Sequence, residues 1–428
     1  MIPQDLYYEI TPKVLPADRE ATIVVRPIHT HASFEADAAY RVDYYAMEGG
    51  PRGAHDAWEV SPRSDGCLVL QPHLAGEQEH RLVISREAEG KRPFQMVVHV
   101  YSLRDDLFGR RPYVGDVHMH THYSDGRESP AYVAARCREV GMDFMAITDH
   151  HQYAPSIEAQ EAFAGIPMEL LILRGEEVHP PGNPVHLVNF GGAFSVNALF
   201  QDKARYAAAV DEYERALGPL VPGCDRRQYA ETLFCLDKIR EGGGLAIYCH
   251  PYWVAGHQYY VSEAFNTQMM DAQPYDALEV IGGYGENEPV SNPLQAARYH
   301  EERSKGKRIP IVGASDAHST DMDRLFGWYW TLVLSPALTQ EALIASIKDL
   351  YSVAVETLPG ERALIYGPFR ISKVAYFMWR EVLPLRNRLC EEEGRLMQAL
   401  IAGHNVRDQL SALRGRVGRL YDRLWAVM

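Results

Sequence analysis

The sequence predicts an α/β barrel of strand–helix units that follows an all-β domain and precedes a helical hairpin. Three observations support this prediction. Short β-like runs fill residues 1–110, strands alternate with helical stretches over 111–360, and apolar residues recur at steps of four and three within 361–428. A chain of 428 residues also exceeds the size at which one hydrophobic core stops growing, so several domains are expected.

Residues 1–110 read as an antiparallel β-sandwich of immunoglobulin-like architecture. The β-like runs include ATIVVRPI, YRVDYYAM, HRLVISR and FQMVVHVYSL, separated by Pro, Gly and charged turns. Short strands at regular spacing are typical of such sandwiches. The turn-forming and charged segment RDDLFGRRPYVG then indicates a domain boundary near residue 111.

Residues 111–360 read as repeated strand–helix units. The strand GDVHMH is followed by a helix with Ser129 as its N-cap, Pro130 in its first turn and Gly141 at its end. Strands that alternate with helices predict a parallel sheet or barrel. A long helical insertion over 197–242 interrupts the alternation, and we expect it to form part of a wall or lid over the site.

Helix-forming residues dominate 361–428. An apolar stripe with heptad stepping comprises Val406, Leu410, Leu413, Val417, Leu420 and Leu424. A similar stripe lies upstream, and AGHN at 402–405 reads as the turn of a helical hairpin. The hairpin either buries the stripe internally or pairs with a second copy, so a homo-oligomer formed through these helices stays open.

The composition excludes several classes of protein. A net charge of −14 argues against binding to double-stranded nucleic acid or to an anionic membrane surface, because both depend on Lys and Arg. The N-terminus lacks the pattern of a signal peptide, and no apolar run approaches the roughly twenty residues of a membrane helix. The six cysteines show no CxxC spacing. We therefore expect a cytoplasmic protein with reduced thiols.

Ligand-type side chains recur at the ends of the apolar runs. His118 and His120 lie two residues apart on a predicted strand, so both imidazoles face one side, and Asp125 follows in the next turn. Other runs lead to ITDHH, RGEEVH, HLVNFG, CHP and SDAH. We expect each strand to deliver its ligands at its carboxyl end, where barrel enzymes place their catalytic groups. The sequence therefore predicts a metal site.

These segments resemble the signature regions of the PHP family, the polymerase and histidinol phosphatase domain, over residues 114–358. The segment DVHMHTHYSDG is similar to the first region, ITDHH to the second, and RGEEVH with HLVNFG to the third, while CHP and SDAH complete the set. The resemblance implies an irregular (β/α)7 barrel with two or three divalent metals at its C-terminal mouth, and it implies hydrolysis of phosphoesters.

The resemblance also implies nine metal ligands. They are His118, His120, Asp125, His150, Glu177, His186, His250, Asp316 and His318. Glu176 is an alternative to its neighbour Glu177, although the family pattern favours Glu177. We expect Glu177 to be shared between a set completed by His118, His120 and Asp316 and a second set completed by His186 and His250. Mixed imidazole and carboxylate ligands suit zinc, manganese or iron.

Further residues receive roles in the implied hydrolysis. A metal-bound hydroxide at a di- or trinuclear site would attack phosphorus. Three histidines are candidates for the acid that protonates the leaving oxygen, namely His122, His151 and His318. Three arginines near strand ends are candidate phosphate contacts, namely Arg127, Arg174 and Arg324.

Several neighbouring side chains keep two interpretations. Asp116 and Asp149 either orient imidazoles or cap turns, and Cys249 is expected to face the core, away from His250. An aromatic cluster either stacks on substrate or packs against the insertion; it consists of Tyr248, Tyr252, Trp253, Tyr259 and Tyr260.

The leading functional hypothesis is a phosphoesterase that acts on a small phosphorylated molecule. A nuclease that acts on short oligonucleotides is the second hypothesis. A non-catalytic scaffold with vestigial metal sites is a third, and an amidohydrolase-like reaction on a substrate without phosphate is a fourth. The loops at the mouth of a barrel choose among such substrates, so the fold alone does not decide between them.

Overall fold

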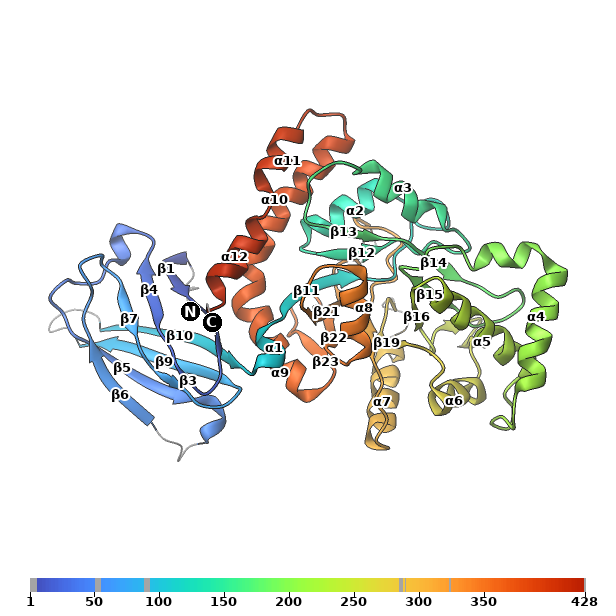
Figure 1. Cartoon of the computed structure of the whole chain (residues 1–428), viewed down its shortest axis with the longest axis horizontal. Coiled ribbons are helices and arrows are strands. Elements are labelled where there is room, and N and C mark those ends of the chain that lie inside the picture. The colour runs from blue at the N-terminus through green and yellow to red at the C-terminus, as the bar shows by residue number, and fades with distance from the viewer. Residues whose placement is uncertain are drawn as a thin grey trace. The chain divides into compact units, whose positions relative to one another are not determined.

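The computed structural model describes residues 6–50, 55–87, 93–284, 288, 290–322 and 325–426 (Figure 1). The chain divides into two units. Unit 1 comprises Met1–Arg111, Tyr376–Arg386 and Gly415–Met428, and unit 2 comprises Pro112–Ala375 and Asn387–Arg414. The predicted mixed α/β class, with a sheet-rich N-terminal part and C-terminal helices, is confirmed.

Unit 1 is built from three antiparallel or mixed sheets. A three-stranded sheet has the order β1 (Tyr8–Thr11), β4 (Ile23–Pro27), β7 (Leu68–Leu70). A five-stranded sheet has the order β2 (Val14–Pro16), β10 (Phe94–Leu103), β9 (Glu79–Arg86), β5 (Tyr40–Ala46), β6 (His55–Val60). The short strands β3 (Arg19–Glu20) and β8 (His73–Leu74) pair with each other, and helix α1 (Asp105–Phe108) ends this part of the chain.

The alternation of side chains along these strands explains the core of unit 1. In β5, Tyr40, Val42 and Tyr44 are buried, and the residues between them are more exposed. Leu82 and Ile84 of β9 are buried by the same two-residue period. The inward side chains of the two larger sheets meet in one hydrophobic cluster.

Unit 2 contains two further sheets. One has the order β13 (Leu171–Leu173), β12 (Phe144–Ala146), β11 (Arg111–Asp116), β21 (Tyr329–Ser335), β22 (Ser352–Glu356), β23 (Leu364–Tyr366). The other has the order β14 (Gly175–Val178), β15 (Leu187–Phe190), β16 (Leu245–Tyr248), β19 (Ala277–Ile281), β20 (Ile311–Gly313). Among the described residues, no continuous ladder closes these sheets into one barrel.

Helices connect the strands of unit 2. They are α2 (Pro130–Glu139), α3 (Ala154–Ala162), α4 (Lys203–Ala216), α5 (Arg226–Glu241), α6 (Glu263–Ala272), α7 (Ser291–Ser304) and α8 (Gln340–Lys348). Ser129 caps α2 as predicted, since its hydroxyl accepts a hydrogen bond from the Tyr132 N–H. No described helix is long and apolar enough to cross a membrane.

The insertion at 197–242 differs from its expected role as a wall or lid. It forms α4 and α5, and Phe234, Leu236 and Ile239 of α5 are buried in a core cluster with strand β16 residue Tyr248. None of its described residues lines the cavity of the candidate site. An amphipathic helix beside a fully buried strand packs onto that strand, which explains the difference.

The C-terminal helices are α9 (Phe369–Phe377), a π-helical turn (Met378–Val382), α10 (Leu383–Ile401), α11 (Arg407–Leu413) and α12 (Arg416–Leu424). Gly415 lies between α11 and α12 and adopts φ +75°, so the helical backbone is interrupted there. All six residues of the apolar stripe are buried within the chain, from Leu410 at 0% exposure to Leu413 at 9%. The stripe is therefore covered by this chain itself.

A buried histidine should make the stability of unit 1 depend on pH. The His80 ring lies 2.8 Å from the Tyr44 hydroxyl and 2.7 Å from the Ser102 hydroxyl. Burial lowers the pKa of His80 from 6.5 to about 4. Between these two pH values His80 binds a proton in the unfolded chain but not in the folded chain. Its contribution to the free energy of unfolding is therefore complete above pH 6.5 and is lost between about pH 6.5 and about pH 4.

We expect wild-type protein to lose about 2 kcal/mol more unfolding free energy than His80→Gln between pH 7 and pH 5. Urea denaturation at both pH values measures this difference. The neighbouring Glu79 does not interfere, because its hydrogen bonds with His99 and Arg380 outweigh burial and lower its pKa to about 2. Equal losses in the two proteins would contradict the prediction.

Candidate metal centre

The ligand-type side chains converge at one edge of the two sheets of unit 2. His118 and His120 follow β11, His150 follows β12, Glu177 lies in β14, His250 follows β16, and Asp316 and His318 follow β20. A cavity of about 430 Å³ opens there, lined in part by Asp125, His150, His186, His250, Asp316 and His318. His118, His120 and Glu177 are fully buried. The nine expected ligands therefore lie together.

One strand delivers its ligand from the opposite end to the one expected. His186 precedes β15, whereas we expected every ligand at the carboxyl end of its strand. Strand β15 pairs antiparallel with both β14 and β16. Its amino end therefore lies at the same edge as the carboxyl ends of its neighbours, and this reversal brings His186 to the other ligands.

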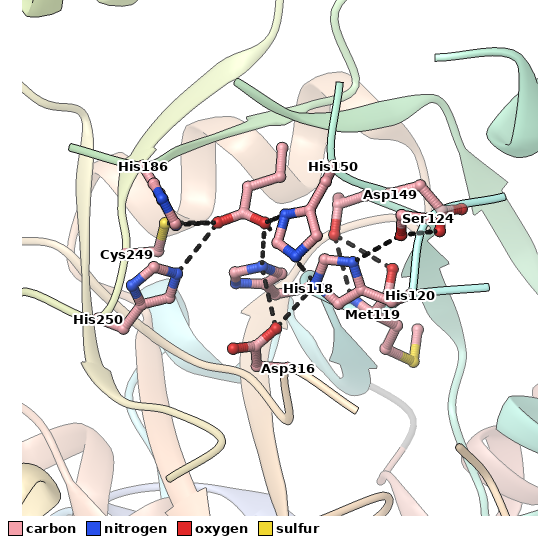
Figure 2. Close-up of polar contacts among 12 residues, drawn as sticks. His118, Met119, His120, Ser124, Asp149, His150, His186, Cys249, His250 and Asp316 are labelled. Atoms are coloured by element: carbon pink, nitrogen blue, oxygen red, sulfur yellow. Dashed lines mark hydrogen bonds and ion pairs between the residues drawn. The ribbon is translucent and has the colours of Figure 1, made fainter. Parts of the chain in front are cut away.

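Glu177 lies at the centre of the group. Its Oε1 atom lies 2.9 Å from His186 Nδ1 and 3.1 Å from His250 Nε2. Its Oε2 atom lies 3.6 Å from His118 Nε2 and 3.7 Å from His120 Nε2. Figure 2 shows the imidazoles of His118, His186 and His250 turned toward a common centre. One carboxylate thus faces imidazoles on both sides.

Two more carboxylates complete the group. Asp316 Oδ1 lies 2.8 Å from His120 Nε2 and 3.3 Å from His118 Nε2. Asp125 lies nearer the mouth, with its oxygens 3.3 Å from His318 Nε2 and 3.4 Å from His150 Nε2. The acidic side chains thus alternate with the basic ones from the buried floor to the rim.

Several subsets place their ligand atoms within 4.8 Å of one another, which is close enough to surround one cation. One subset is His118, His120 and Glu177, another is Glu177, His186 and His250, and a third is His120, Asp125, His150 and His318. Glu177 is common to the first two, as a carboxylate shared by two metals would be.

Unsatisfied atoms at the centre fit a bound cation. His118 Nε2, Glu177 Oε2 and His186 Nδ1 are buried and make no well-aligned hydrogen bond, although His150 Nδ1 lies 2.5 Å from Glu177 Oε2 and His186 Nδ1 lies 2.9 Å from Glu177 Oε1. Buried polar groups are almost always hydrogen-bonded, so three such atoms that face one another require an explanation. A metal ion between them would satisfy all three, and the imidazole and carboxylate donors suit zinc, manganese or iron.

The pKa values of the rim histidines show how strongly this site attracts positive charge. Burial by itself lowers the pKa of His150, but its contacts with the Asp125 and Glu177 carboxylates outweigh burial and raise the pKa to about 10. Burial also lowers the pKa of His318, but the hydrogen bond with Asp125 outweighs burial and raises the pKa to about 9. A metal ion binds neutral imidazole, so it must displace these protons.

Sequence reasoning missed Glu279, which supports two ligands. Glu279 is fully buried in β19, where its Oε2 accepts a hydrogen bond from His118 Nδ1–H at 3.0 Å and its Oε1 accepts one from the His250 backbone N–H at 3.1 Å. The bond to Nδ1 leaves Nε2 of His118 free for a metal. The sequence did contain a signal for Glu279, because a carboxylate inside the apolar run DALEVIGG is unusual and indicates a buried, paired charge.

Asp116 and Asp149 bind backbone N–H groups, which is the turn-capping role of the two that we expected for them. Asp116 Oδ1 accepts hydrogen bonds from the backbone N–H groups of His118, at 3.2 Å, and Ser315, at 3.1 Å. Asp149 accepts from the backbone N–H and the hydroxyl of Thr121, at 2.7 and 2.6 Å. Both carboxylates therefore fix the backbone that carries the HxH pair.

The two adjacent glutamates of GEEV face opposite sides. Glu176 accepts hydrogen bonds from Asn189, Ser195 and Asn197 side chains, away from the imidazoles. Glu177 faces the histidines, as described above. The strand period of two residues separates their roles.

Two side chains that are not among the nine expected ligands also lie near the centre. His179 Nε2 lies 3.3 Å from Glu177 Oε2, and its ring stacks on that of His186 at 3.7 Å. Cys249 is buried in a core cluster as expected, but it does not face away from the ligands, because its Sγ lies 4.0 Å from Glu177 Oε1. Strand β16 ends at Tyr248, and His250 has φ +28°, so strict alternation no longer holds at these residues.

Unusual backbone geometry accompanies the ligands. Asp316 has φ +50° and His250 has φ +28°, a range of φ that residues other than glycine adopt uncommonly. A Cβ on Gly283 would lie 1.8 Å from the Ser315 carbonyl oxygen, so only glycine permits this approach beside Asp316. The surrounding structure thus holds the ligands in positions that local preference disfavours.

The structure does not bring all of the predicted substrate and acid residues to the cavity. His122 is exposed, and its Nδ1 lies 3.1 Å from the Glu128 carbonyl oxygen. The exposed Arg127 contacts Met322 Sδ at 3.1 Å, and the exposed Arg174 donates to Gln160 Oε1 at 3.4 Å. None of the three lines the cavity, and Arg324 lies outside the described residues.

The other two acid candidates lie nearer. His318 lines the cavity, and its Nδ1 lies 2.8 Å from the Asp316 carbonyl oxygen, which leaves Nε2 turned toward Asp125. His151 is exposed, with its ring 4.5 Å from that of His179, which lines the cavity.

Comparison with known families identifies part of this region. The family model of the PHP domain matches residues 116–218. DNA polymerase/3'-5' exonuclease PolX of Bacillus subtilis is 43% identical over 56 residues, which cover 13% of this chain and 10% of that protein. The chain thus spans about a tenth of the length of this curated relative.

Solved structures give weaker similarities. A two-domain protein from Bacteroides vulgatus that contains a predicted PHP-like metal-dependent phosphoesterase is 14% identical, with a TM-score of 0.38 and coverage of 57% of this chain and 65% of that one. A candidate metal-dependent phosphoesterase from Bifidobacterium adolescentis is 18% identical, with a TM-score of 0.32 and coverage of 63% and 96%. The similarity to the PHP family therefore rests on the match over residues 116–218.

Glu279 provides a test of the centre that leaves every direct ligand in place. We expect Glu279→Gln to weaken metal binding by about 10- to 100-fold, because the neutral amide no longer holds His118 through a charged hydrogen bond. Competition with a metal-binding dye measures the affinity. Glu231→Gln changes a buried carboxylate that binds Asn183 instead, so it should retain wild-type affinity. Unchanged affinity in Glu279→Gln would contradict the assignment.

Proposed function

We propose that this chain, which contains a PHP domain, is a metal-dependent phosphoesterase that acts on a small phosphorylated molecule. The observation that carries the proposal is the convergence of buried, unsatisfied ligand atoms on Glu177 beneath an open cavity. The family match over residues 116–218 supports the same reaction class. Sites of this kind, with several imidazoles and shared carboxylates, serve hydrolysis of anionic esters.

Two or three divalent ions would occupy the centre in this proposal. His118, His120, Glu177 and Asp316 would hold the first, Glu177, His186 and His250 the second, and Asp125, His150 and His318 a third. When bound, such ions supply Lewis acidity that activates water near neutral pH and neutralises phosphate charge. The metal is proposed to be zinc, manganese or iron.

The residues of the chain itself contribute position and exclusion of water. His118, His120 and Glu177 are buried, so the floor of the site is closed to solvent and interactions there are strong. Glu279 and the strained backbone at Asp316 and His250 hold the ligands in place before substrate arrives. Preorganised groups need little rearrangement during reaction.

A histidine at the rim would supply the proton that the leaving oxygen requires. His318 lines the cavity and is our first candidate when two ions are bound, because its Nε2 is then not occupied by a third ion. His151 lies beside His179 and is the candidate when three ions are bound. The position of His122 outside the cavity removes its support for this role.

We also propose that the two sheets of unit 2 close into an irregular barrel around the site. Isolated parallel bridges join His150 with Glu177 and Met119 with Ala317. These bridges link the ends of β12 and β14 and the ends of β11 and β20, at the edge where the ligands lie. They support a ring of strands around the centre, as in barrel enzymes whose sites lie at one rim.

A nuclease acting on short oligonucleotides is the second candidate. The 56-residue similarity to a bacterial polymerase and exonuclease favours it. The net charge of −14 disfavours long polyanionic substrates, because their binding depends on many Lys and Arg contacts.

A panel of esters tests the proposal. We expect phosphate release from monoesters, or cleavage of diesters or short oligonucleotides, only when zinc, manganese or iron is present. His118→Ala and Asp316→Ala should each reduce this activity by more than about 100-fold, because each removes a ligand. Colorimetric phosphate release and chromatography of the products measure the activity.

His404→Ala is the matched control. His404 is exposed in the turn between α10 and α11, so its removal should leave activity at the wild-type level. Circular dichroism should show that all three variants are folded. Full activity in both His118→Ala and Asp316→Ala would refute the proposed function.

A further inference from the structure

Two aromatic side chains form a wall of the cavity next to the metal ligands. Trp253 and Tyr260 both line the cavity, and their ring centroids lie 4.7 Å apart at 62°. The Trp253 ring lies 5.5 Å from that of His186 and 6.0 Å from that of His250. These separations are those of contacting rings, so the wall borders the set formed by Glu177, His186 and His250 directly.

A small hairpin holds these two rings in place. Trp253 precedes β17 (Val254–Ala255) and Tyr260 follows β18 (Gln258–Tyr259), and the Tyr260 N–H donates to the Trp253 carbonyl at 2.9 Å. The Val254 N–H donates to Glu288 Oε2 at 2.9 Å, which ties the hairpin to another residue that lines the cavity. Both rings therefore extend from the same hairpin.

Other members of the aromatic cluster have structural roles. Tyr248 is fully buried and donates its hydroxyl to Asn266, and Tyr252 is nearly buried and donates to Glu263 at 3.2 Å. Trp253 is only half-buried, and Tyr260 is 43% exposed. Large aromatic surfaces that stay accessible beside a polar centre are typical of ligand contacts.

The charges of the cavity restrict its occupant further. Asp125, Asp316 and Glu288 line it, and no Lys or Arg does so among the residues that the structure describes. Arg127 and Arg174 make their contacts elsewhere, as described above. Metal ions at the ligand sets would neutralise one phosphate group, whereas the described part of the lining offers carboxylates and no side-chain cation to a second anionic group.

We propose that the substrate is a ring-bearing phosphate ester whose organic part carries no additional negative charge. This inference rests on the proposed function, because the phosphate is assigned to the metal sets and the ring to the wall of Trp253 and Tyr260. A cavity of about 430 Å³ is the right size for such a small molecule. The class excludes sugar bisphosphates and nucleoside diphosphates, which carry further charge.

Non-hydrolysable phosphonates test this assignment with the full-length, metal-loaded protein. Phenylphosphonate should bind at least about tenfold more tightly than methylphosphonate, because only the phenyl ring contacts the aromatic wall. 4-Carboxyphenylphosphonate should lose most of this gain, because its second charge meets an acidic cavity. Isothermal titration calorimetry measures the three affinities.

Variants separate the wall from the metal sets. Trp253→Leu and Tyr260→Leu should each reduce the preference for phenylphosphonate, measured as the ratio of its affinity to that of methylphosphonate, at least about threefold. Tyr259→Leu is the matched control, because Tyr259 is exposed on the same hairpin and does not line the cavity. Thermal unfolding checks each variant, and the exposed Tyr260 is a position where substitution leaves the core intact.

The outcomes distinguish this inference from the proposed function. Equal affinities of wild-type protein for phenylphosphonate and methylphosphonate would overturn the aromatic assignment, and so would a preference that survives both substitutions. A gain in affinity from the added carboxylate would overturn the charge assignment. In those cases, metal-dependent binding of methylphosphonate would still support the proposed phosphoesterase function. If neither phosphonate binds in the presence of metal, the proposed function itself fails.

Discussion

The site depends on one buried negative charge. Glu177 is fully buried, and His118, His120, His186 and His250 approach its two oxygens. Removing a carboxylate from water costs several kcal/mol unless opposite charge or hydrogen bonds compensate. The imidazoles provide this compensation, because His186, His118 and His150 outweigh burial and hold the pKa of Glu177 well below its usual range. A metal ion would take over this role from the imidazole protons, so the same buried charge creates affinity for metal.

The remaining carboxylates support this centre by restricting what surrounds it. Glu279 orients His118 from behind, while Asp116 and Asp149 secure the backbone of the HxH segment. Glu176 points away and joins β14 to the segment around Asn197. Acidic residues close together in sequence thus take different roles, because the pleat of a strand directs neighbouring side chains to opposite faces.

The cavity above the centre has two chemically distinct sides. Imidazoles and carboxylates form one side, and the rings of Trp253 and Tyr260 form the other. The first side carries the nitrogen and oxygen donors of the candidate metal site, and the second presents apolar ring faces. The ligands come from the strand ends of the sheet, whereas the rings come from a hairpin inserted after β16. Such loops vary between proteins of one fold and choose the substrate.

The sequence by itself determined the mixed α/β class and the types of residue at the strand ends. Those properties follow from local periodicity, because a period of two places His118 and His120 on one face whatever the rest of the chain does. Only the tertiary structure decided that Glu279 and His179 join the group, that Cys249 lies beside it, and that Arg127 and Arg174 lie outside it. Those outcomes depend on strand order, on the antiparallel direction of β15 and on the left-handed backbone at His250. Such features join residues far apart in the chain, so no local pattern specifies them.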